Sequence, residues 1–330
     1  MSQYDVYGLG NALVDIQYQV DVAFFEEMEI DKGVMTLIEE DRQQALIGAL
    51  GGKEMARSSG GSAANTMIAL ANCGGNGYYA CKVAEDADGD FYLKDLSAAD
   101  VASNPSNRAE GITGKCLVMI TDDADRTMNT FLGITSTFGP EQIEESVIAD
   151  SQYIYIEGYL VAADGGFEAA QVAQKFAQAN NTKVALTISD PFIVSVFKER
   201  MTALVDAGVD MLFCNEDEAK MLTDTETTAD AIDVLSTRTN GFAVTCGADG
   251  ARVRDGGDVL HSPGFSVDAV DTNGAGDSFA GAYLFAVTNG YDTAQAAKLA
   301  TYVSSRVVSK YGPRFEDKLD ADEIARILSL

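Results

Sequence analysis

Residues 271–277 read Asp-Thr-Asn-Gly-Ala-Gly-Asp, and this glycine-rich turn indicates both the fold class and the chemistry of the chain. Gly274 and Gly276 have no Cβ, so the backbone can turn tightly and direct several amide N–H groups at one anion. Apolar residues recur at helical spacing over 275–287. The amides therefore belong at a helix N-terminus, where the helix dipole also favours negative charge.

The carboxylate of Asp277 falls in the first turn of that predicted helix, close to the expected anion. A carboxylate beside a phosphate is unfavourable unless it has a task, and accepting a proton from an attacking hydroxyl is such a task. A plain N-capped helix with acidic residues would explain Asp271 or Asp277 alone, but not both with two glycines and a threonine between them. We therefore predict a kinase that phosphorylates an alcohol.

The charge of the chain limits its partners. The 330 residues include 51 acidic and 23 basic side chains, a net charge of −28, and 46% of them are apolar. The electric field of this negative charge opposes binding to a nucleic-acid backbone or an anionic membrane, so we expect neither partner. It also repels a nucleotide, so a phosphate site here needs backbone amides, a divalent metal and a few placed cations.

The cysteines and the single histidine narrow the compartment and the chemistry. Five cysteines form no C-x-x-C pair, which fits reduced thiols and a cytoplasmic protein. His261 alone cannot build a multi-histidine metal site, and it lies where a strand is expected to end in a turn. Neither a basic leader nor a run of 18 apolar residues is visible, so we expect no signal peptide and no membrane span.

Short apolar runs alternate with amphipathic stretches along the chain. The runs predict strands at 6–9, 78–83, 153–156, 184–188, 211–213 and 242–245. The amphipathic stretches predict helices at 62–73, 91–96, 167–179, 192–205, 229–238 and 293–310. This alternation favours a three-layer α/β domain over 1–330, with a mostly parallel sheet between two layers of helices.

Two segments interrupt this rhythm, at about 12–37 and 111–133, where residues alternate in β fashion. We expect them to pair into a small sheet that covers a cleft at the strand ends. Within the second segment, a turn is expected at 122–125, before Arg126. The alternative is two surface hairpins with no shared function.

Polar residues follow the first predicted strand and precede the first long helix. Asn11 and Asp15 stand beyond the carboxyl end of strand 6–9, where a carboxylate can accept two hydrogen bonds from a vicinal diol. Gly60 and Gly61 allow a ligand to approach the backbone, and Asn65 can bind a polyol hydroxyl from the helix. A solvated strand-end aspartate and an ordinary Gly-Gly-Ser turn are the alternatives.

Two further strand ends carry candidate nucleotide ligands. Asn215 and Glu218 stand at the N-cap and N3 positions of a helix, which suits either a capping box or a contact to the water of a hydrated Mg²⁺. The stretch Thr245-Cys246-Gly247-Ala248-Asp249-Gly250 suits either a hairpin or the lining of a phosphate groove.

In this order the motifs resemble the ribokinase or PfkB carbohydrate kinase family over nearly the whole chain. The details resemble its adenosine kinase-like subgroup, through Gly-Asn-Ala-Leu-Val-Asp-Ile at 10–16, Ser-Asp-Pro-Phe at 189–192, Asn-Glu-Asp-Glu at 215–218 and Gly-Pro-Arg-Phe at 312–315. The resemblance implies a ribokinase-like three-layer sandwich with a small β-sheet lid. It also implies an ATP-dependent kinase that requires Mg²⁺, with a monovalent cation such as K⁺ as a further candidate ion.

The resemblance assigns catalytic roles around the glycine-rich turn. Asp277 would be the base, and the amides of Gly274, Ala275 and Gly276 would form the anion hole. Arg126, in the second lid segment, would close over the phosphates.

The resemblance also assigns the acceptor site. The acceptor would contact a set of polar and apolar residues: Asn11, Asp15, Leu37, Gly60, Gly61, Asn65 and Tyr159. Of these, Leu37 and Tyr159 would enclose a nucleoside base. The resemblance also implies that Asn215 and Glu218 organise Mg²⁺ through water. From the residues themselves, the candidate contacts to the nucleotide are Asn215, Thr245, Gly247, Gly250, Asp271 and Thr272.

Two classes of function stay open at this point. The first is a small-molecule kinase, acting on the 5′-hydroxyl of a nucleoside or on a sugar such as ribose, fructose or a 2-keto-3-deoxy acid, as a monomer or homodimer. The second is a non-catalytic ligand-binding relative. The presence of Asp277, both glycines, Asn215 and Glu218 favours the first, because a pure binder needs no base.

Overall fold

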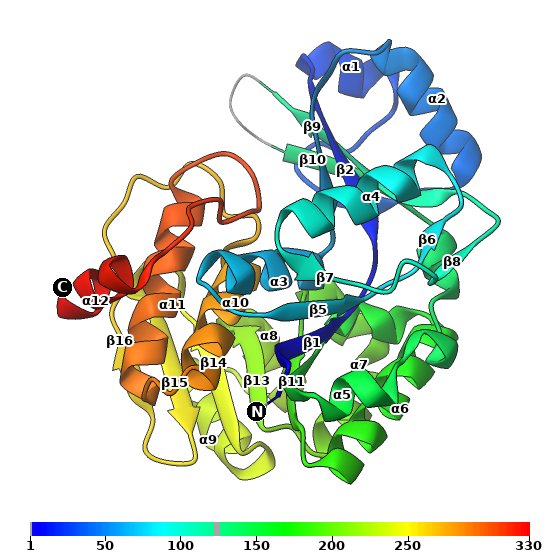
Figure 1. Cartoon of the computed structure of the whole chain (residues 1–330). Helices are drawn as coiled ribbons and strands as arrows, with labels where there is room; N and C mark the ends of the chain where they lie inside the picture. Colours follow the sequence, from blue (N-terminus) through cyan, green and yellow to red (C-terminus); the bar gives the residue numbers. More distant parts are fainter. Residues whose placement is uncertain (1, 122–125) are drawn as a thin grey trace.

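Strand β1 (Tyr4–Leu9) is buried along most of its length, as its apolar run requires of an inner strand of a parallel sheet. In the computed structural model, which describes residues 2–121 and 126–330, β1 lies in a nine-stranded sheet of order β16-β15-β14-β13-β12-β11-β1-β5-β7 (Figure 1). The strands from β14 to β7 pair in parallel, whereas β15 and β16 at one edge are antiparallel. Besides β1, the strands are β5 (Gly77–Ala80), β7 (Val101–Ala102), β11 (Ser151–Ile156), β12 (Lys183–Thr187), β13 (Met211–Asn215), β14 (Gly241–Thr245), β15 (Ala251–Asp255) and β16 (Leu260–Ser262).

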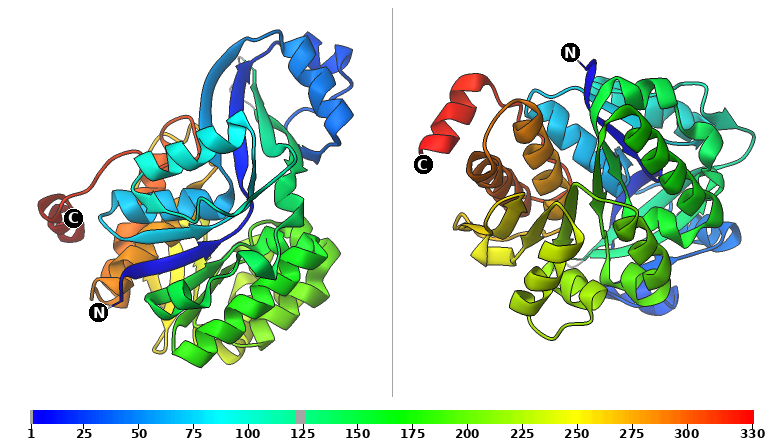
Figure 2. Two further views of the ribbon diagram at one scale, coloured as in Figure 1. Left: turned by 45° about the vertical axis from the view of Figure 1, so that its right-hand side comes forward. Right: turned by 90° about the horizontal axis from the view of Figure 1, so that it is seen from below.

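Helices cover both faces of this sheet, which confirms the three-layer α/β prediction (Figure 2). One face packs against α3 (Ser62–Asn72), α10 (Ala275–Thr288) and α11 (Thr293–Val308), with α12 (Ala321–Ser329) outside α11. The other face packs against α5 (Glu145–Ala149), α6 (Asp164–Asn180), α7 (Pro191–Asp206), α8 (Glu216–Thr223) and α9 (Thr228–Arg238). Successive strand residues alternate between the two cores: Val6 joins the first and Tyr7 the second.

A second, five-stranded sheet of order β3-β10-β9-β2-β4 stands beyond the carboxyl end of β1 (Figure 1). Its strands are β2 (Leu13–Gln19), β3 (Met35–Leu37), β4 (Glu54–Gly60), β9 (Thr113–Ile120) and β10 (Arg126–Gly133). Near its base, β6 (Val83–Ala84) pairs with β8 (Arg108–Ala109). The small sheet that joins 12–37 to 111–133 is thus confirmed, while its action as a lid stays a prediction.

The bounds of this small sheet differ from the prediction in two ways. First, β4 belongs to it, although only two segments were expected. Second, residues 22–27 form a helix, α1 (Val22–Glu27), and not an extended segment. Asp21 caps α1 by accepting a hydrogen bond from the Phe24 N–H at 2.9 Å, and Phe25 alone is buried. A further helix, α2 (Glu40–Leu50), lies between β3 and β4, and the turn expected at 122–125 falls outside the described residues.

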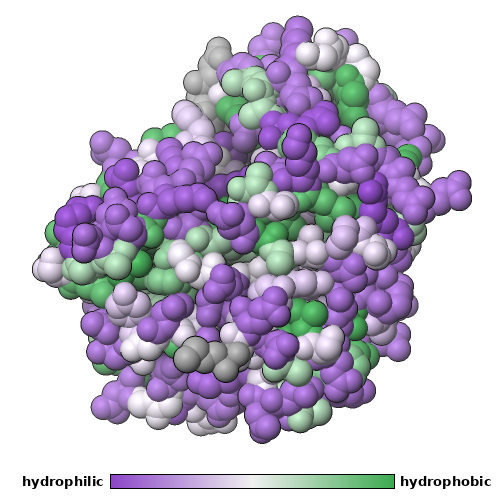
Figure 3. Space-filling model, viewed as in Figure 1, coloured by the Kyte–Doolittle hydropathy of each residue, from purple (hydrophilic) through white to green (hydrophobic). Residues whose placement is uncertain are grey.

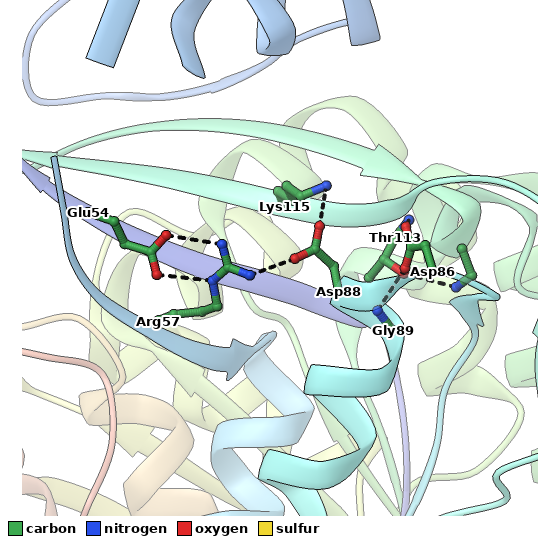
Figure 4. Close-up of polar contacts among 8 residues, drawn as sticks. Glu54, Arg57, Asp86, Asp88, Gly89, Thr113 and Lys115 are labelled. Atoms are coloured by element: carbon green, nitrogen blue, oxygen red, sulfur yellow. Dashed lines mark hydrogen bonds and ion pairs between the residues drawn. The ribbon is translucent and has the colours of Figure 1, made fainter. Parts of the chain in front are cut away.

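Polar contacts join the small sheet to the start of α4 (Ala87–Ala98), as Figure 4 shows. Arg57 on β4 lies between the carboxylates of Glu54 and Asp88, at 3.0 and 2.8 Å. Lys115 on β9 reaches the second oxygen of Asp88 at 2.7 Å. Asp86, the N-cap of α4, accepts hydrogen bonds from the backbone and hydroxyl of Thr113. These contacts fix β4 and β9 relative to α4.

Hydrophilic residues cover most of the face in Figure 3, with smaller hydrophobic areas between them. This fits a chain with 51 acidic residues, because charged side chains stay in water. In the described part of the chain, none of the helices has the length and apolar character needed to cross a bilayer.

Candidate active site

Asp277 lies in the first turn of α10, as the sequence predicts. Its carboxylate accepts hydrogen bonds from the Ser62 hydroxyl at 2.6 Å and from the Asn65 side-chain amide at 3.2 Å, both on α3. Burial raises the pKa of Asp277 to about 6, against these two hydrogen bonds, which lower it. The carboxyl group is thus held in place and is ionised above about pH 6.

Residues 271–277, here called the anion turn, have the shape that the two glycines predict. Gly274 is the N-cap of α10 with φ of 73°, and a Cβ there would come within 3.0 Å of the Pro313 backbone. A Cβ on Gly276 would meet no atom within 4 Å in the described residues, so packing within the chain does not require this glycine. The prediction that this glycine lets an anion approach the first-turn amides of α10 is compatible with this open space and stays a prediction.

Asp15 and the two glycines Gly60 and Gly61 come together at the base of the small sheet. A Cβ on Gly60 would come within 3.0 Å of the Asp15 carboxylate, and one on Gly61 would come equally close to the Asn11 carbonyl oxygen. Burial raises the pKa of Asp15 to about 7, while Arg314 and Arg126 lower it and the charge on Asp277 raises it further. A half-buried carboxylate therefore faces the backbone of Gly60, close to the candidate base.

Asn65 is 5% exposed, and its amide nitrogen donates to Asp277. Within the described residues, its Oδ1 atom is buried and has no hydrogen-bond partner. A buried acceptor of this kind is costly unless a ligand satisfies it. A hydroxyl group bound beside Asp277 could donate to this oxygen, which agrees with the polyol contact that the sequence predicts.

Glu157, which the sequence analysis did not select, is 1% exposed and connects three parts of the site. It follows β11 and accepts hydrogen bonds from the backbone and side-chain amides of Asn11, at 3.2 and 2.8 Å, and from the Ala63 N–H at 2.9 Å. Burial raises its pKa to about 7 despite these bonds. The signal in the sequence was an acidic residue directly after the apolar run Tyr153-Ile154-Tyr155-Ile156.

Arg126 on β10 and Asp271 of the anion turn form an ion pair at 3.0 Å, with side chains 8% and 7% exposed. Asp271 also accepts hydrogen bonds from the Asn273 and Gly312 amides. A cavity of about 420 Å³ is lined by Arg126 and Met128 of β10 on one side and by residues 269–273 on the other. The small sheet thus already contacts the anion turn at this point.

Asn215 and Glu218 form a complete capping box at the start of α8. Both Glu218 oxygens accept from Asn215, at 2.9 and 2.8 Å, and the Glu218 N–H donates back to the Asn215 side chain at 2.9 Å. Burial raises the pKa of Glu218 to about 7, and the charge on Asp277 contributes to this rise. The structure therefore contains the capping box that was one of the two alternatives for these residues. Glu218 is still close enough to the candidate base for the charge on Asp277 to affect its pKa.

No group of three or more His, Cys, Asp and Glu side chains within 2–121 and 126–330 could hold a metal by itself. Mg²⁺ keeps most of its water and binds largely through phosphate oxygens, so it needs no such cage. Both Glu218 oxygens already accept hydrogen bonds from Asn215, so the predicted contact of Glu218 with a water of this ion stays a prediction. The absence of such a group among the described residues is compatible with a Mg²⁺ ion that arrives with a nucleotide.

The remaining nucleotide candidates lie along the ends of β13 and β14. Thr245 pairs with Asn215 across the two strands. β14 and β15 form a hairpin. Gly250 has φ of 89° and packs against Ser262 and Gly264, so the hairpin itself requires a glycine at this position. Gly247, with φ of 55°, has open space around its Cα, and Thr272 is exposed. Thr272 belongs to the anion turn itself, whereas Thr245, Gly247 and Gly250 lie at or just beyond the end of β14.

The structure does not bring together the two residues expected to enclose a base. Leu37 lies on the edge strand β3 and is 54% exposed, whereas Tyr159 lies in the 3₁₀ turn Gly158–Ala162 on the core. The Tyr159 hydroxyl is 3.5 Å from Asp190, at the end of β12. Phe192, two residues further on, is 58% exposed and was not selected. An exposed aromatic ring next to a strand end could have indicated it.

These contacts define what the site can do. A hydroxyl group placed beside Asp277 and Asn65 would meet a base and a hydrogen-bond acceptor. The predicted diol ligand Asp15 is close enough for the charge on Asp277 to raise its pKa. The anion turn presents a helix N-terminus to the same place. Attack of an alcohol on a phosphoryl group is the reaction for which all of these groups have a use.

Comparison with known proteins agrees with this chemistry. The pfkB family of carbohydrate kinases matches residues 23–319. The solved structure of adenosine kinase from Sinorhizobium meliloti is 34% identical, with a TM-score of 0.89 and full coverage of both chains. That of a probable sugar kinase from Rhizobium etli CFN 42 is 31% identical, with a TM-score of 0.91 over 99% of this chain and 100% of the other. Adenosine kinase 2 of Arabidopsis thaliana is 26% identical over 97% of this chain and 98% of its own.

Proposed function

We propose, because the chain belongs to the pfkB family of carbohydrate kinases, that it transfers the γ-phosphoryl group of ATP to the 5′-hydroxyl of an adenosine-like nucleoside. The observation that carries this proposal is the position of Asp277. Its carboxylate is fixed by Ser62 and Asn65 at the start of α10, beside the anion turn, and burial raises its pKa to about 6. A base of this pKa is ionised at neutral pH and can still accept a proton readily.

In the reaction, Asp277 accepts the proton of the acceptor hydroxyl as its oxygen attacks the γ-phosphorus. The bond from that phosphorus to the bridging oxygen breaks, and ADP leaves with the bond's electron pair. The amides at Gly274, Ala275 and Gly276 donate to the transferring phosphoryl group, which costs no reorganisation because the helix already holds them. Mg²⁺, bound with the nucleotide, would neutralise phosphate charge, and Asn215 and Glu218 would contact its water.

The acceptor would bind at the base of the small sheet. Asp15 accepts hydrogen bonds from two neighbouring hydroxyls of the ribose, and the absence of a side chain at Gly60 and Gly61 lets the sugar approach the backbone. Asn65 Oδ1 would accept a hydroxyl hydrogen bond, which satisfies its only free acceptor among the described residues. Asn11 is kept in place by Glu157.

We infer that the five-stranded sheet acts as a lid within one ribokinase-like domain. Closure would bring Leu37 over the nucleoside base, opposite Tyr159, and exclude water that competes as phosphoryl acceptor. Arg126 would then exchange part of its contact with Asp271 for the phosphates, because a polyphosphate offers a stronger charge.

A nucleoside is favoured over a free sugar by two aromatic side chains at the strand ends, Tyr159 and the 58% exposed Phe192. A ring system can stack on such side chains, whereas ribose offers no comparable area. The adenosine kinases of Sinorhizobium meliloti and Arabidopsis thaliana support this choice. A sugar kinase is the second candidate, supported by the 31% identical Rhizobium etli protein.

The test is ADP release with Mg²⁺ and ATP on a panel of nucleosides and on ribose, fructose and a 2-keto-3-deoxy acid, with the phosphorylated position determined by mass spectrometry and NMR. We expect the highest kcat/KM for a purine nucleoside, with a 5′-monophosphate as product. A higher value for a free sugar would replace the nucleoside assignment with the second candidate. A protein that binds ligands of this panel without any turnover would be a non-catalytic relative.

A further inference from the structure

Arg314 lies in the Gly-Pro-Arg-Phe stretch, far in sequence from the small sheet, yet its side chain reaches β4. The side chain is 15% exposed. Its guanidinium donates to the Ser59 carbonyl oxygen and to the Ser59 hydroxyl, and two of its nitrogens lie 3.0 Å from a carboxylate oxygen of Asp95 on α4. A planar guanidinium with several fixed donors suits such a set of neighbouring acceptors.

These contacts hold the end of β4 on the side that has no partner strand. Asp95 accepts hydrogen bonds from the Ser59 N–H and hydroxyl, both at 2.8 Å. On the next residue, the Gly60 carbonyl oxygen accepts from the Tyr92 hydroxyl at 2.9 Å. The free edge of a strand is thereby bonded to side chains instead of water. Because Gly60 faces Asp15, these bonds set one wall of the proposed acceptor pocket.

The same loop also contacts the anion turn. The Gly312 N–H donates to Asp271 at 2.9 Å, and the Pro313 carbonyl packs so closely on Gly274 that a Cβ there would come within 3.0 Å of it. Phe315 is fully buried, and its carbonyl oxygen accepts from Asn72 at the end of α3. Residues 312–315, here called the strap, therefore join the phosphate side of the site to the acceptor side.

We propose that Arg314 is a positioning residue, which holds the acceptor wall of β4 and the anion turn in one fixed relation through the strap. This inference rests on the proposed function in placing the acceptor at Asp15 and Gly60 and the phosphate at the anion turn. Arg314 is also the strongest of the charges that lower the pKa of Asp15. It thus helps to keep the diol ligand ionised, in addition to fixing its surroundings.

The first test compares Arg314→Gln and Arg314→Lys with Lys318→Gln, using whichever acceptor the wild-type enzyme turns over fastest. Lys318 pairs with Asp100 near the same strap, but both side chains are largely exposed, so its loss should have little effect. We expect Arg314→Gln to raise the acceptor KM about tenfold or more, as loss of a buried charged hydrogen-bond donor predicts. Arg314→Lys should raise the acceptor KM less than Arg314→Gln does, because lysine keeps the positive charge.

The result that contradicts the proposal is an unchanged acceptor KM with a lower apparent kcat. That pattern would mean that the substitution only reduces the folded fraction. Ser59→Ala gives a milder second variant, since it removes the hydroxyl shared by Arg314 and Asp95 and leaves the backbone bonds in place. It should raise the acceptor KM less than Arg314→Gln, and no increase in either variant would overturn the proposal.

The second test needs no substrate, so it separates this inference from the proposed function. Amide hydrogen exchange of the free protein is followed in residues 54–60 and 271–277. Arg314→Gln should accelerate exchange in both segments, and Lys318→Gln in neither. Acceleration in 54–60 alone would show that the strap does not connect the two sides, even if the enzyme proves to be a nucleoside kinase.

Discussion

Burial raises the pKa of four carboxyl groups around the anion turn, to about 7 for Asp15, Glu157 and Glu218 and about 6 for Asp277. The strands and the start of α10 place these acids where burial disfavours their charged forms. Such a cluster is typical of a functional site. Its consequence is that the state of the site changes between about pH 6 and 7, within the range where the enzyme is expected to work.

Asp15→Ala tests the diol ligand. We expect the KM for the acceptor to rise about tenfold to a hundredfold, because two hydroxyls lose a charged hydrogen-bond acceptor, while the KM for ATP changes little. Steady-state kinetics with each substrate varied in turn measures both constants. Equal increases in the two KM values would mean that Asp15 serves the structure instead of the acceptor.

Glu157→Gln tests the buried connection between Asn11 and Ala63. The new amide would place an N–H₂ group against N–H donors, so we expect a loss of about 1–3 kcal/mol in the free energy of unfolding. Urea unfolding measures it, with Glu168→Gln on the exposed side of α6 as control. If both variants unfold at the wild-type urea concentration, Glu157 is not the connection that its hydrogen bonds suggest.

Single residues were predictable where the local sequence alone determines their role. The Gly274 turn and Asp277 follow from seven consecutive residues, because a glycine with positive φ before a helix needs no distant partner. Glu157 and Arg314 could not be selected in this way. Their roles depend on Asn11 and Ser59, which are 146 and 255 residues away in sequence.

At the scale of elements, we expect the small sheet to be the part that moves. It joins the core directly at β2 and β4 and is fixed at its base by the contacts of Arg57, Lys115 and Asp86 (Figure 4). Its far strand β3 is three residues long and exposed throughout. Motion is therefore expected at the β3 and β10 side of the sheet, which carries Leu37 and Arg126.

Hydrogen exchange with saturating adenosine, and separately with ribose, tests closure of this sheet. We expect adenosine to slow exchange in residues 35–37 and 126–133, because only a base supplies area for contact with Leu37 and Tyr159. Ribose should leave both segments near the rate of the free protein. Protection by ribose and not by adenosine would remove the nucleoside assignment and leave the kinase chemistry in place.

Most elements of the core were predictable because each buries an apolar run of the right period. β7, α5 and α12 were not predicted, and the first two are only two and five residues long. The small sheet was predictable only in part. β4 reads Glu-Met-Ala-Arg-Ser-Ser-Gly, with little apolar alternation, because its first four residues are exposed and neither face is buried there. Its outer edge is bonded to Asp95 and Arg314, which lie far away in sequence. Helix α1 was missed because it is only six residues long and buries one side chain, Phe25.

At the scale of the whole molecule, the net charge of −28 acts on stability. Like charges repel in the compact state, and salt screens this repulsion within a Debye length of about 10 Å at 0.1 M. The raised carboxyl pKa values also destabilise the folded state as the pH rises. The folded state binds more protons than the unfolded state between about pH 4 and 7, so stability from these groups is present below pH 4 and is lost as pH rises through 7.

Thermal unfolding at several salt concentrations and pH values measures both effects. We expect Tm to rise by on the order of 5 °C between ~0.05 M and ~1 M NaCl, and to fall as pH rises from 5 to 8. Below pH 4 the trend reverses, because Asp86 and Asp95 have lowered pKa values and lose their hydrogen bonds and ion pairs on protonation. A Tm that is insensitive to salt would show that the acidic surface is already compensated.

The most direct test of the kinase assignment is the rate of phosphoryl transfer in Asp277→Asn. The amide is isosteric and can still bond with Ser62 and Asn65, so the fold and ATP binding should be retained, as thermal unfolding and nucleotide titration can verify. With purine nucleoside, Mg²⁺ and ATP, we expect kcat to fall by roughly 10²–10⁴, the usual contribution of a positioned base. The wild-type kcat should also decline below about pH 6, as Asp277 is protonated. A decrease of less than threefold in Asp277→Asn would contradict the role of Asp277 as the base and, with it, the mechanism proposed for this enzyme.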